Sequence, residues 1–81
     1  MIKVLFFASY REKLGTDRLE LAEIPENLSA LRSLLSAKGQ DWQEVVNDSR
    51  TLVALNQTMT RKDFEIKEGD EIAFFPPVTG G

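Results

Sequence analysis

The chain opens on a nearly continuous apolar run, residues 2–8, interrupted only by Lys3. The run is rich in β-branched and aromatic side chains and is apolar at both odd and even positions, which predicts a strand in the middle of a sheet. Residues 9–15 break the pattern with charged side chains and a glycine. Residues 18–21 then alternate polar and apolar, as a half-buried strand does. We therefore expect the first two strands to form a hairpin.

The clearest helical pattern follows this pair. Four leucines between positions 28 and 35 recur at helical spacing. Asn27 is a favoured N-cap residue, and Gly39 suits the position just beyond a helix C-terminus. We expect this apolar stripe to pack across the sheet. Asp41 could cap a second, shorter helix, but that segment is too short for periodicity to separate a helix from a turn.

The second half of the chain alternates strands and turns. Residues 51–55 predict a strand, and Asn56-Gln57 predicts the turn that follows it. A weaker strand pattern surrounds Met59 and Phe64. Residues 68–70 then indicate a turn, and residues 71–75 predict the last strand.

This order of elements predicts an α+β fold in which one main helix lies across one face of a mixed sheet. If the first and last strands are both central, they lie side by side and parallel, which is the β-grasp, or ubiquitin-like, arrangement. A chain of 81 residues closes a single hydrophobic core. We therefore expect one β-grasp domain over residues 1–75 and an extended C-terminal tail over residues 76–81.

Composition excludes several classes of function. The chain has no cysteine and no histidine, so thiolate and imidazole chemistry are absent. The formal net charge is −3 and no basic run is longer than Arg61-Lys62, which argues against nucleic acid as a partner. No apolar run is long enough to cross a membrane and no leader pattern is present, so the expected compartment is the cytoplasm.

The tail carries the most distinctive chemistry in the sequence. Pro76 and Pro77 favour stiff polyproline geometry, and the next four residues are Val78, Thr79, Gly80 and Gly81. Without Cβ atoms, the terminal glycines can enter a channel too narrow for other residues. The tail delivers one reactive group, the Gly81 carboxylate, which must be activated by another enzyme. The alternative is a frayed end with no function.

A second candidate feature is an excess of aromatic residues. Side chains alternate along a strand, so Phe6 and Phe74 are expected on the helix side and Phe7 and Phe75 together on the open face, near Met59. Exposed apolar patches of this kind usually bind partners. The alternative is that loops cover the rings. Arg11, Arg61 and Lys62 could add polar contacts at the rim of the patch, of which Arg11 is taken as the candidate partner-binding residue. The alternative is favoured for all three, because lone surface charges are more often simply solvated. Five acidic residues either steer a basic partner or keep the protein soluble: Asp63, Glu65, Glu68, Asp70 and Glu71.

Four segments together resemble the sulfur-carrier subunits of molybdopterin synthase. They are residues 1–8 (MIKVLFFA), 11–15 (REKLG), 55–57 (LNQ) and, most specifically, 69–81 (GDEIAFFPPVTGG). The resemblance runs from end to end of the chain. It implies a β-grasp protein whose apolar contact surface includes Phe7, Met59 and Phe75.

The resemblance also implies chemistry and partners. The Gly81 carboxylate would be adenylated with ATP by an E1-like adenylyltransferase and converted to a thiocarboxylate with sulfur from a sulfurtransferase. It would then give that sulfur to cyclic pyranopterin monophosphate inside the large catalytic subunit, in a heterotetramer. No cofactor is expected on the chain itself, and it is not expected to be an enzyme alone. The alternatives are a thiamine-pathway sulfur carrier, a ubiquitin-like modifier, or a β-grasp interaction module with an idle tail.

Overall fold

The computed structural model describes residues 1–77, which form five strands and three helices. In chain order these are β1 (Ile2–Phe6), α1 (Ser9–Leu14), β2 (Arg18–Leu21), α2 (Leu28–Ser36), α3 (Gln40–Val46), β3 (Leu52–Leu55), β4 (Thr58–Thr60) and β5 (Glu71–Phe75). Among these residues no helix combines the length and the apolar character needed to cross a membrane.

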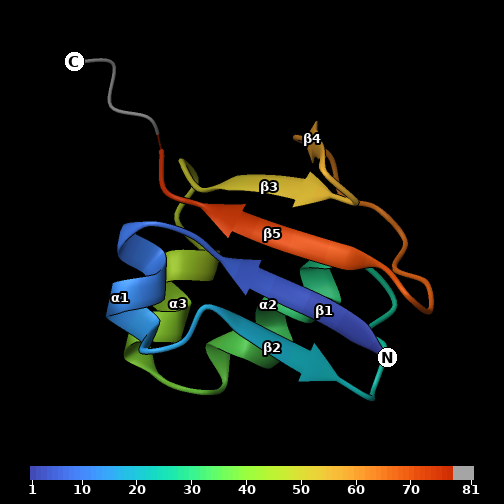
Figure 1. Ribbon diagram of the computed structural model, residues 1–81, viewed down its shortest axis with the longest axis horizontal. Coiled ribbons are helices and arrows are strands. Elements are labelled where there is room, and N and C mark those ends of the chain that lie inside the picture. The colour runs from blue at the N-terminus through green and yellow to red at the C-terminus, as the bar shows by residue number, and fades with distance from the viewer. Residues whose placement is uncertain (78–81) are drawn as a thin grey trace.

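The strands form one mixed sheet in the order β2-β1-β5-β3-β4 (Figure 1). β1 and β5 are central and parallel, with Val4 opposite Ile72 and Phe6 opposite Phe74. The other pairs, β1 with β2, β3 with β5 and β3 with β4, are antiparallel. The parallel pairing of the first and last strands confirms the predicted β-grasp arrangement.

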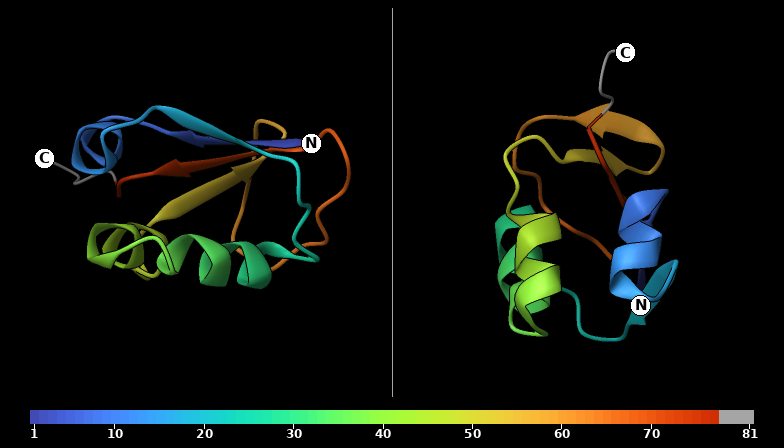
Figure 2. Two further views of the ribbon diagram at one scale, coloured as in Figure 1. Left: turned by 90° about the horizontal axis from the view of Figure 1, so that it is seen from below. Right: turned by 90° about the vertical axis from the view of Figure 1, so that its left-hand side faces the viewer.

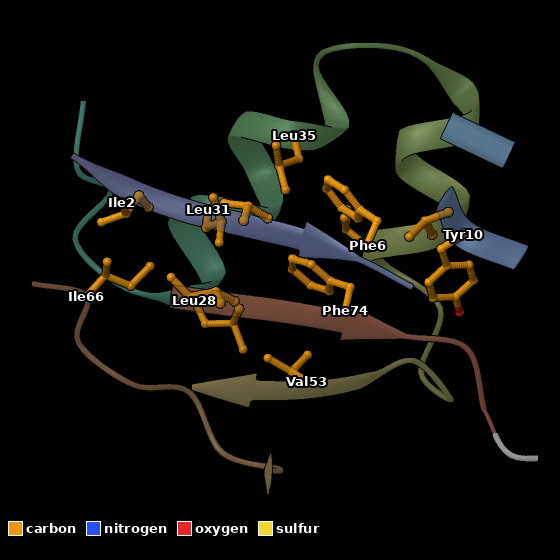
Figure 3. Packing of buried hydrophobic residues seen from close by; sticks show 13 residues of the cluster. Ile2, Phe6, Tyr10, Leu28, Leu31, Leu35, Val53, Ile66 and Phe74 are labelled. Atoms are coloured by element: carbon orange, nitrogen blue, oxygen red, sulfur yellow. The ribbon is translucent and has the colours of Figure 1, made fainter. Parts of the chain in front are cut away.

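The molecule has two layers, with α2 and α3 covering one face of the sheet and α1 at the end of the sheet (Figure 2). Between the layers, side chains from the central strands meet the apolar face of α2, and Leu31 and Leu35 are fully buried there (Figure 3). Phe6 and Phe74 lie in this core with their rings stacked at a centroid distance of 5.8 Å. The even-numbered positions of β1 and β5 thus face the helices, as their parity predicts.

The segment after β1 differs from the expected plain loop, because Ser9–Leu14 forms the helix α1. A helix of six residues is too short to show an apolar period, and Tyr10 is its one buried side chain. The Tyr10 hydroxyl lies 2.6 Å from Thr51 Oγ1, which donates its own proton to the Val45 carbonyl at 2.7 Å. Tyr10 is therefore the donor to Thr51, and the pair ties α1 to the α3–β3 connection.

The boundary between α2 and α3 also differs from the prediction. α2 ends in a right-handed residue, Ala37, so Gly39 is not its C′ residue. Gly39 is instead the N-cap of α3, and Asp41 lies in the first turn of that helix without capping it. At the other end of α2 the prediction is confirmed, since Asn27 Oδ1 accepts from the Ala30 amide at 2.8 Å.

The turn between β3 and β4 is the predicted Asn56-Gln57 pair, with φ angles of 50° and 71°. Two consecutive left-handed residues make a type I′ hairpin turn, whose twist matches that of the strands. β4 is short, however, and Phe64 lies outside it, packed against the core. The weak strand expected around Met59 and Phe64 therefore includes only Met59.

Candidate partner-docking surface at the root of the tail

The open face of the sheet carries two stacked aromatic rings. Phe7 follows β1 and Phe75 ends β5, and their ring centroids lie 4.7 Å apart with the planes 5° from parallel. Phe7 is 41% exposed, whereas its neighbour Phe6 is 1% exposed in the core. The alternation of side chains along parallel strands thus separates one aromatic pair for the core from one for the surface.

Apolar side chains from neighbouring strands surround these rings. Met59 of β4, 54% exposed, lines the same two shallow depressions as Phe7 and Phe75. We call this surface the open-face patch; it comprises Leu5, Phe7, Leu52, Ala54, Met59, Ala73 and Phe75. Among residues 1–77 no loop or helix buries Phe7 or Met59, and Phe75 is half-buried. The expectation that the rings stay exposed is therefore met for Phe7 and only partly for Phe75.

The patch continues into the first two residues of the tail. Pro76 and Pro77 line one of its depressions, of about 450 Å³, together with Phe7, Phe75 and Ala8. Both prolines are half-buried. Proline lacks a backbone N–H and so cannot extend the ladder of β5, which ends the strand here. A partner that covers the patch therefore also contacts the base of the tail.

The backbone beside this depression is strained at Ala8. Its φ of 54° and ψ of −129° belong to a region that glycine adopts freely and alanine rarely does. The conformation is that of the second residue of a type II′ turn, closed by a hydrogen bond of 3.1 Å from the Tyr10 amide to the Phe7 carbonyl. This turn determines the direction in which the chain leaves β1 and enters α1. No pattern in the sequence indicates the turn.

The basic residues expected around the patch come from α1 and from the segment that follows β4. Arg11 is an exposed residue of α1, at the end of the sheet where β5 leads into the tail (Figure 1). Its contact with a partner stays a prediction. Arg61 is exposed and lines a separate cleft beside α2, and its contact with a partner also stays a prediction. Lys62 is exposed.

Two members of the acidic set have structural roles. Asp63 Oδ2 accepts from the Ser29 hydroxyl at 2.6 Å, which lowers the pKa of Asp63. Asp70 accepts from the Asn56 side-chain amide at 3.0 Å and from the Lys67 amide at 2.8 Å, and these bonds lower the pKa of Asp70. Both carboxylates thus hold loops to neighbouring elements.

The outer tail residues, Val78, Thr79, Gly80 and Gly81, lie outside the described residues. Over the residues that are described, no cluster of three or more carboxylates could hold a metal ion. What the geometry establishes is a mainly apolar surface that is continuous with the root of the tail. Leu5, Leu52 and Ala8 were not singled out in the sequence; the parity of β1 signals Leu5, but Ala8 depends on the turn.

Comparison with known proteins places this geometry in a family. The model of the ThiS family matches residues 4–81. The molybdopterin synthase sulfur carrier subunit of Escherichia coli (strain K12) is 48% identical over 81 residues, which is 100% of both chains. The chain belongs to the ThiS family, and within it to the molybdopterin synthase sulfur carrier subunits.

Solved structures of similar proteins agree with the fold. One is a complex of subunits 1 and 2 of molybdopterin-converting factor from Helicobacter pylori 26695, whose matching chain has a TM-score of 0.72 at 25% identity. The match covers 99% of this chain and 97% of that one. Small archaeal modifier protein 1 from Methanosarcina acetivorans has a TM-score of 0.80 at 26% identity, covering 99% and 95%.

Proposed function

We propose that this protein carries sulfur as a thiocarboxylate on Gly81 and donates it during molybdopterin synthesis. The observation that carries the proposal is the continuity between the open-face patch and Pro76-Pro77. A carrier must present its C-terminus to an enzyme while its body is held by that enzyme. An apolar surface at the root of the tail meets this need, because docking there orients the tail.

The chemistry begins with a carboxylate that is inert until it is activated. Attack of the Gly81 carboxylate on the α-phosphorus of ATP, in an E1-like adenylyltransferase, forms an acyl-adenylate and releases pyrophosphate. A sulfur nucleophile at the oxidation level of hydrosulfide, supplied through a sulfurtransferase, then attacks the acyl carbon and expels AMP. The product is a thiocarboxylate, whose sulfur is a much better nucleophile than a carboxylate oxygen.

Transfer takes place in the active site of the large synthase subunit. The thiocarboxylate sulfur attacks a side-chain carbon of cyclic pyranopterin monophosphate, and an oxygen substituent leaves that carbon with the electrons of the broken C–O bond. Water then cleaves the resulting thioester, which returns the Gly81 carboxylate and leaves the sulfur on the substrate. Two such transfers build a dithiolene. The chain supplies the donor and the large subunit supplies catalysis, so the chain is not an enzyme alone.

The partners follow from the same scheme. The Helicobacter pylori structure contains subunits 1 and 2 in one complex, which supports the large subunit as a partner here. We propose that Phe7, Met59 and Phe75 enter that interface, with Arg11 at its edge, in a cytoplasmic heterotetramer of two small and two large subunits. ATP is a substrate of the activating enzyme, and the chain itself needs no bound cofactor.

The test is the intact mass of the protein after incubation with ATP, an activating enzyme of this family and a sulfur source. We expect a gain of about 16 Da, since one sulfur replaces one oxygen. Fragmentation should localise this gain to Gly81. No gain with an activating enzyme that modifies its own carrier would overturn the proposal.

The matched control is the same chain extended by one alanine after Gly81. It should neither gain sulfur nor support molybdopterin formation, because the added methyl group blocks a channel that fits only glycine. Its melting temperature should equal that of the unextended protein. Sulfur transfer by the extended chain would contradict a glycine-selective channel.

A second candidate function is conjugation to other proteins. The similarity to small archaeal modifier protein 1 favours it, because a modifier uses the same activation of a C-terminal carboxylate. Here the acyl-adenylate would be captured by a lysine amine, which forms an isopeptide bond in place of a thiocarboxylate. Mass spectrometry of cell proteins for a Gly80-Gly81 remnant on lysine distinguishes the two outcomes.

A further inference from the structure

A second concave site lies between α2 and the strands β3 and β4. It has a volume of about 520 Å³, and its walls include Leu28 and Arg32 of α2 and Val53 of β3. Val53 faces the core, so this cleft lies on the helix side of the sheet. The open-face patch is centred on the other face of the sheet, and of its members Leu52 also lines the cleft.

Of the residues that the structure describes, no carboxylate lines this cleft, whereas three arginines do: Arg32, Arg50 and Arg61. Such a concentration of positive charge is notable in a chain whose net charge is −3. Arg50 is paired with Asp48, through Nη2 to Oδ2 at 3.1 Å and Nε to Oδ1 at 3.2 Å. Within residues 1–77 neither Arg32 nor Arg61 forms an ion pair, so two guanidinium groups are not neutralised by a described carboxylate.

A second observation indicates that Arg32 lacks a hydrogen-bond partner. Its Nε is buried and has no hydrogen-bond partner among the described residues. Buried donors in folded proteins are almost always paired, because an unpaired one has lost its hydrogen bonds to water without replacement. A ligand with acceptor oxygens in the cleft would supply the missing partner.

We propose that this cleft binds a phosphate-type oxyanion. Guanidinium groups are planar and permanently charged, and their paired N–H donors match the oxygens of a phosphate. Ser49, which lines the same cleft, adds a hydroxyl that no described contact occupies. The volume accommodates more than one phosphate group, so the ligand is either free phosphate or pyrophosphate, or the phosphate end of a nucleotide.

The experiment is a titration of the ¹⁵N-labelled full chain, followed by amide chemical shifts. Sodium phosphate, pyrophosphate and AMP are the three probes, each balanced with sodium chloride so that ionic strength is constant. We expect saturable shifts confined to residues 49–53, 60 and 61 and to the first half of α2. Saturation by AMP at lower concentration than by phosphate identifies a nucleotide source, and tighter binding of pyrophosphate identifies a free oxyanion.

Two substitutions test the arginines, and a third is the matched control. Arg61→Gln is the first, because Arg61 is exposed and its replacement should not affect folding. Arg32→Gln is the second, since it removes the unpaired Nε. Each should weaken binding about tenfold, the effect of losing one charge-assisted hydrogen bond. Arg18→Gln changes an exposed arginine on the edge strand β2 and should leave binding unchanged.

Three results would overturn the proposal. The first is the absence of saturable shifts with all three probes. The second is equal binding in Arg61→Gln, Arg32→Gln and the unmodified chain. The third is equal binding of acetate and phosphate at the same ionic strength, which would identify a carboxylate site of a partner protein in place of a phosphate site.

Discussion

The ring of Phe7 stacks on the ring of Phe75 with a centroid distance of 4.7 Å, although the two residues are 68 positions apart in the sequence. The parallel pairing of β1 with β5 brings the two rings together, since it sets Phe6 opposite Phe74. Phe7 and Phe75 each follow one of these residues, so their side chains lie on the open face. The same pairing places both rings beside Pro76.

The adjacent residues Phe6 and Phe7 should therefore respond in opposite ways to truncation. Phe7→Ala should lower the free energy of unfolding by only about 0.5–1.5 kcal/mol, the value of an aromatic pair. It should weaken binding to a large subunit of molybdopterin synthase at least thirtyfold, as loss of an interface hot spot does. Calorimetric titration and chemical denaturation measure the two effects.

Phe6→Ala is the matched control for this prediction. Phe6 is 1% exposed, so its truncation leaves a cavity and should cost about 3–5 kcal/mol of stability. Where the variant remains folded, its affinity for the large subunit should be nearly unchanged. A large affinity loss in Phe6→Ala without one in Phe7→Ala would place the interface elsewhere.

The strained turn at Ala8 predicts a stabilising substitution. Ala8→Gly should raise the free energy of unfolding by roughly 1 kcal/mol, because glycine adopts this backbone conformation without steric cost. Ala30→Gly within α2 is the comparison, and it should lower stability by roughly 0.5–1 kcal/mol. Urea denaturation measures both, and a destabilised Ala8→Gly would show that the Cβ of Ala8 contributes more by packing than it costs in strain.

Asn56 is expected to stabilise the protein in two separable ways. Its φ of 50° suits asparagine or glycine, and its side chain bonds to the Glu71 amide at 2.9 Å and to Asp70 at 3.0 Å. Asn56→Gly removes the bonds alone and should cost about 1–2 kcal/mol. Asn56→Ala adds left-handed strain and should cost about 1 kcal/mol more. Equal losses in the two variants would mean that the turn conformation contributes little.

The lowered pKa of Asp70 predicts a contribution to acid sensitivity. The Asn56 amide and the Lys67 amide both donate to the ionised carboxylate, so the folded state holds its pKa below the ordinary 3.8. The stabilisation is therefore complete above pH 3.8 or so and disappears as the pH falls through the lower pKa of the folded state. Asp70→Asn should lessen the loss of stability between about pH 5 and pH 2.

Urea denaturation at several pH values measures this slope. The Asp70→Asn variant keeps part of this slope, because hydrogen bonds also lower the pKa of Glu44, Asp48 and Asp63. The informative quantity is the difference between the two proteins. An unchanged slope in Asp70→Asn would mean that Asp70 is bonded as strongly in the unfolded chain.

Elements with a clear period could be predicted from the sequence, and those that depend on contacts could not. The leucine stripe of α2 and its Asn27 cap, the turn at Asn56-Gln57 and the parity of Phe7 and Phe75 are local patterns, and all are confirmed. The helix α1 was missed because its single buried residue, Tyr10, is held by Thr51, which is 41 positions away. Gly39 was assigned to the C-terminus of α2 but is the N-cap of α3. Glycine is favoured at both positions, so a glycine between two helices does not show which helix it belongs to.

The sequence by itself determined which side chains of the central strands and of α2 face the core, because alternation along a strand and the helical period follow from backbone geometry. It also determined which chemistry is absent, through the lack of cysteine and histidine. Only the tertiary structure decided that Arg32, Arg50 and Arg61 share one cleft, and that the turn at Ala8 borders the base of the tail. These relationships join residues far apart in the chain, and no local period encodes the packing that brings them together.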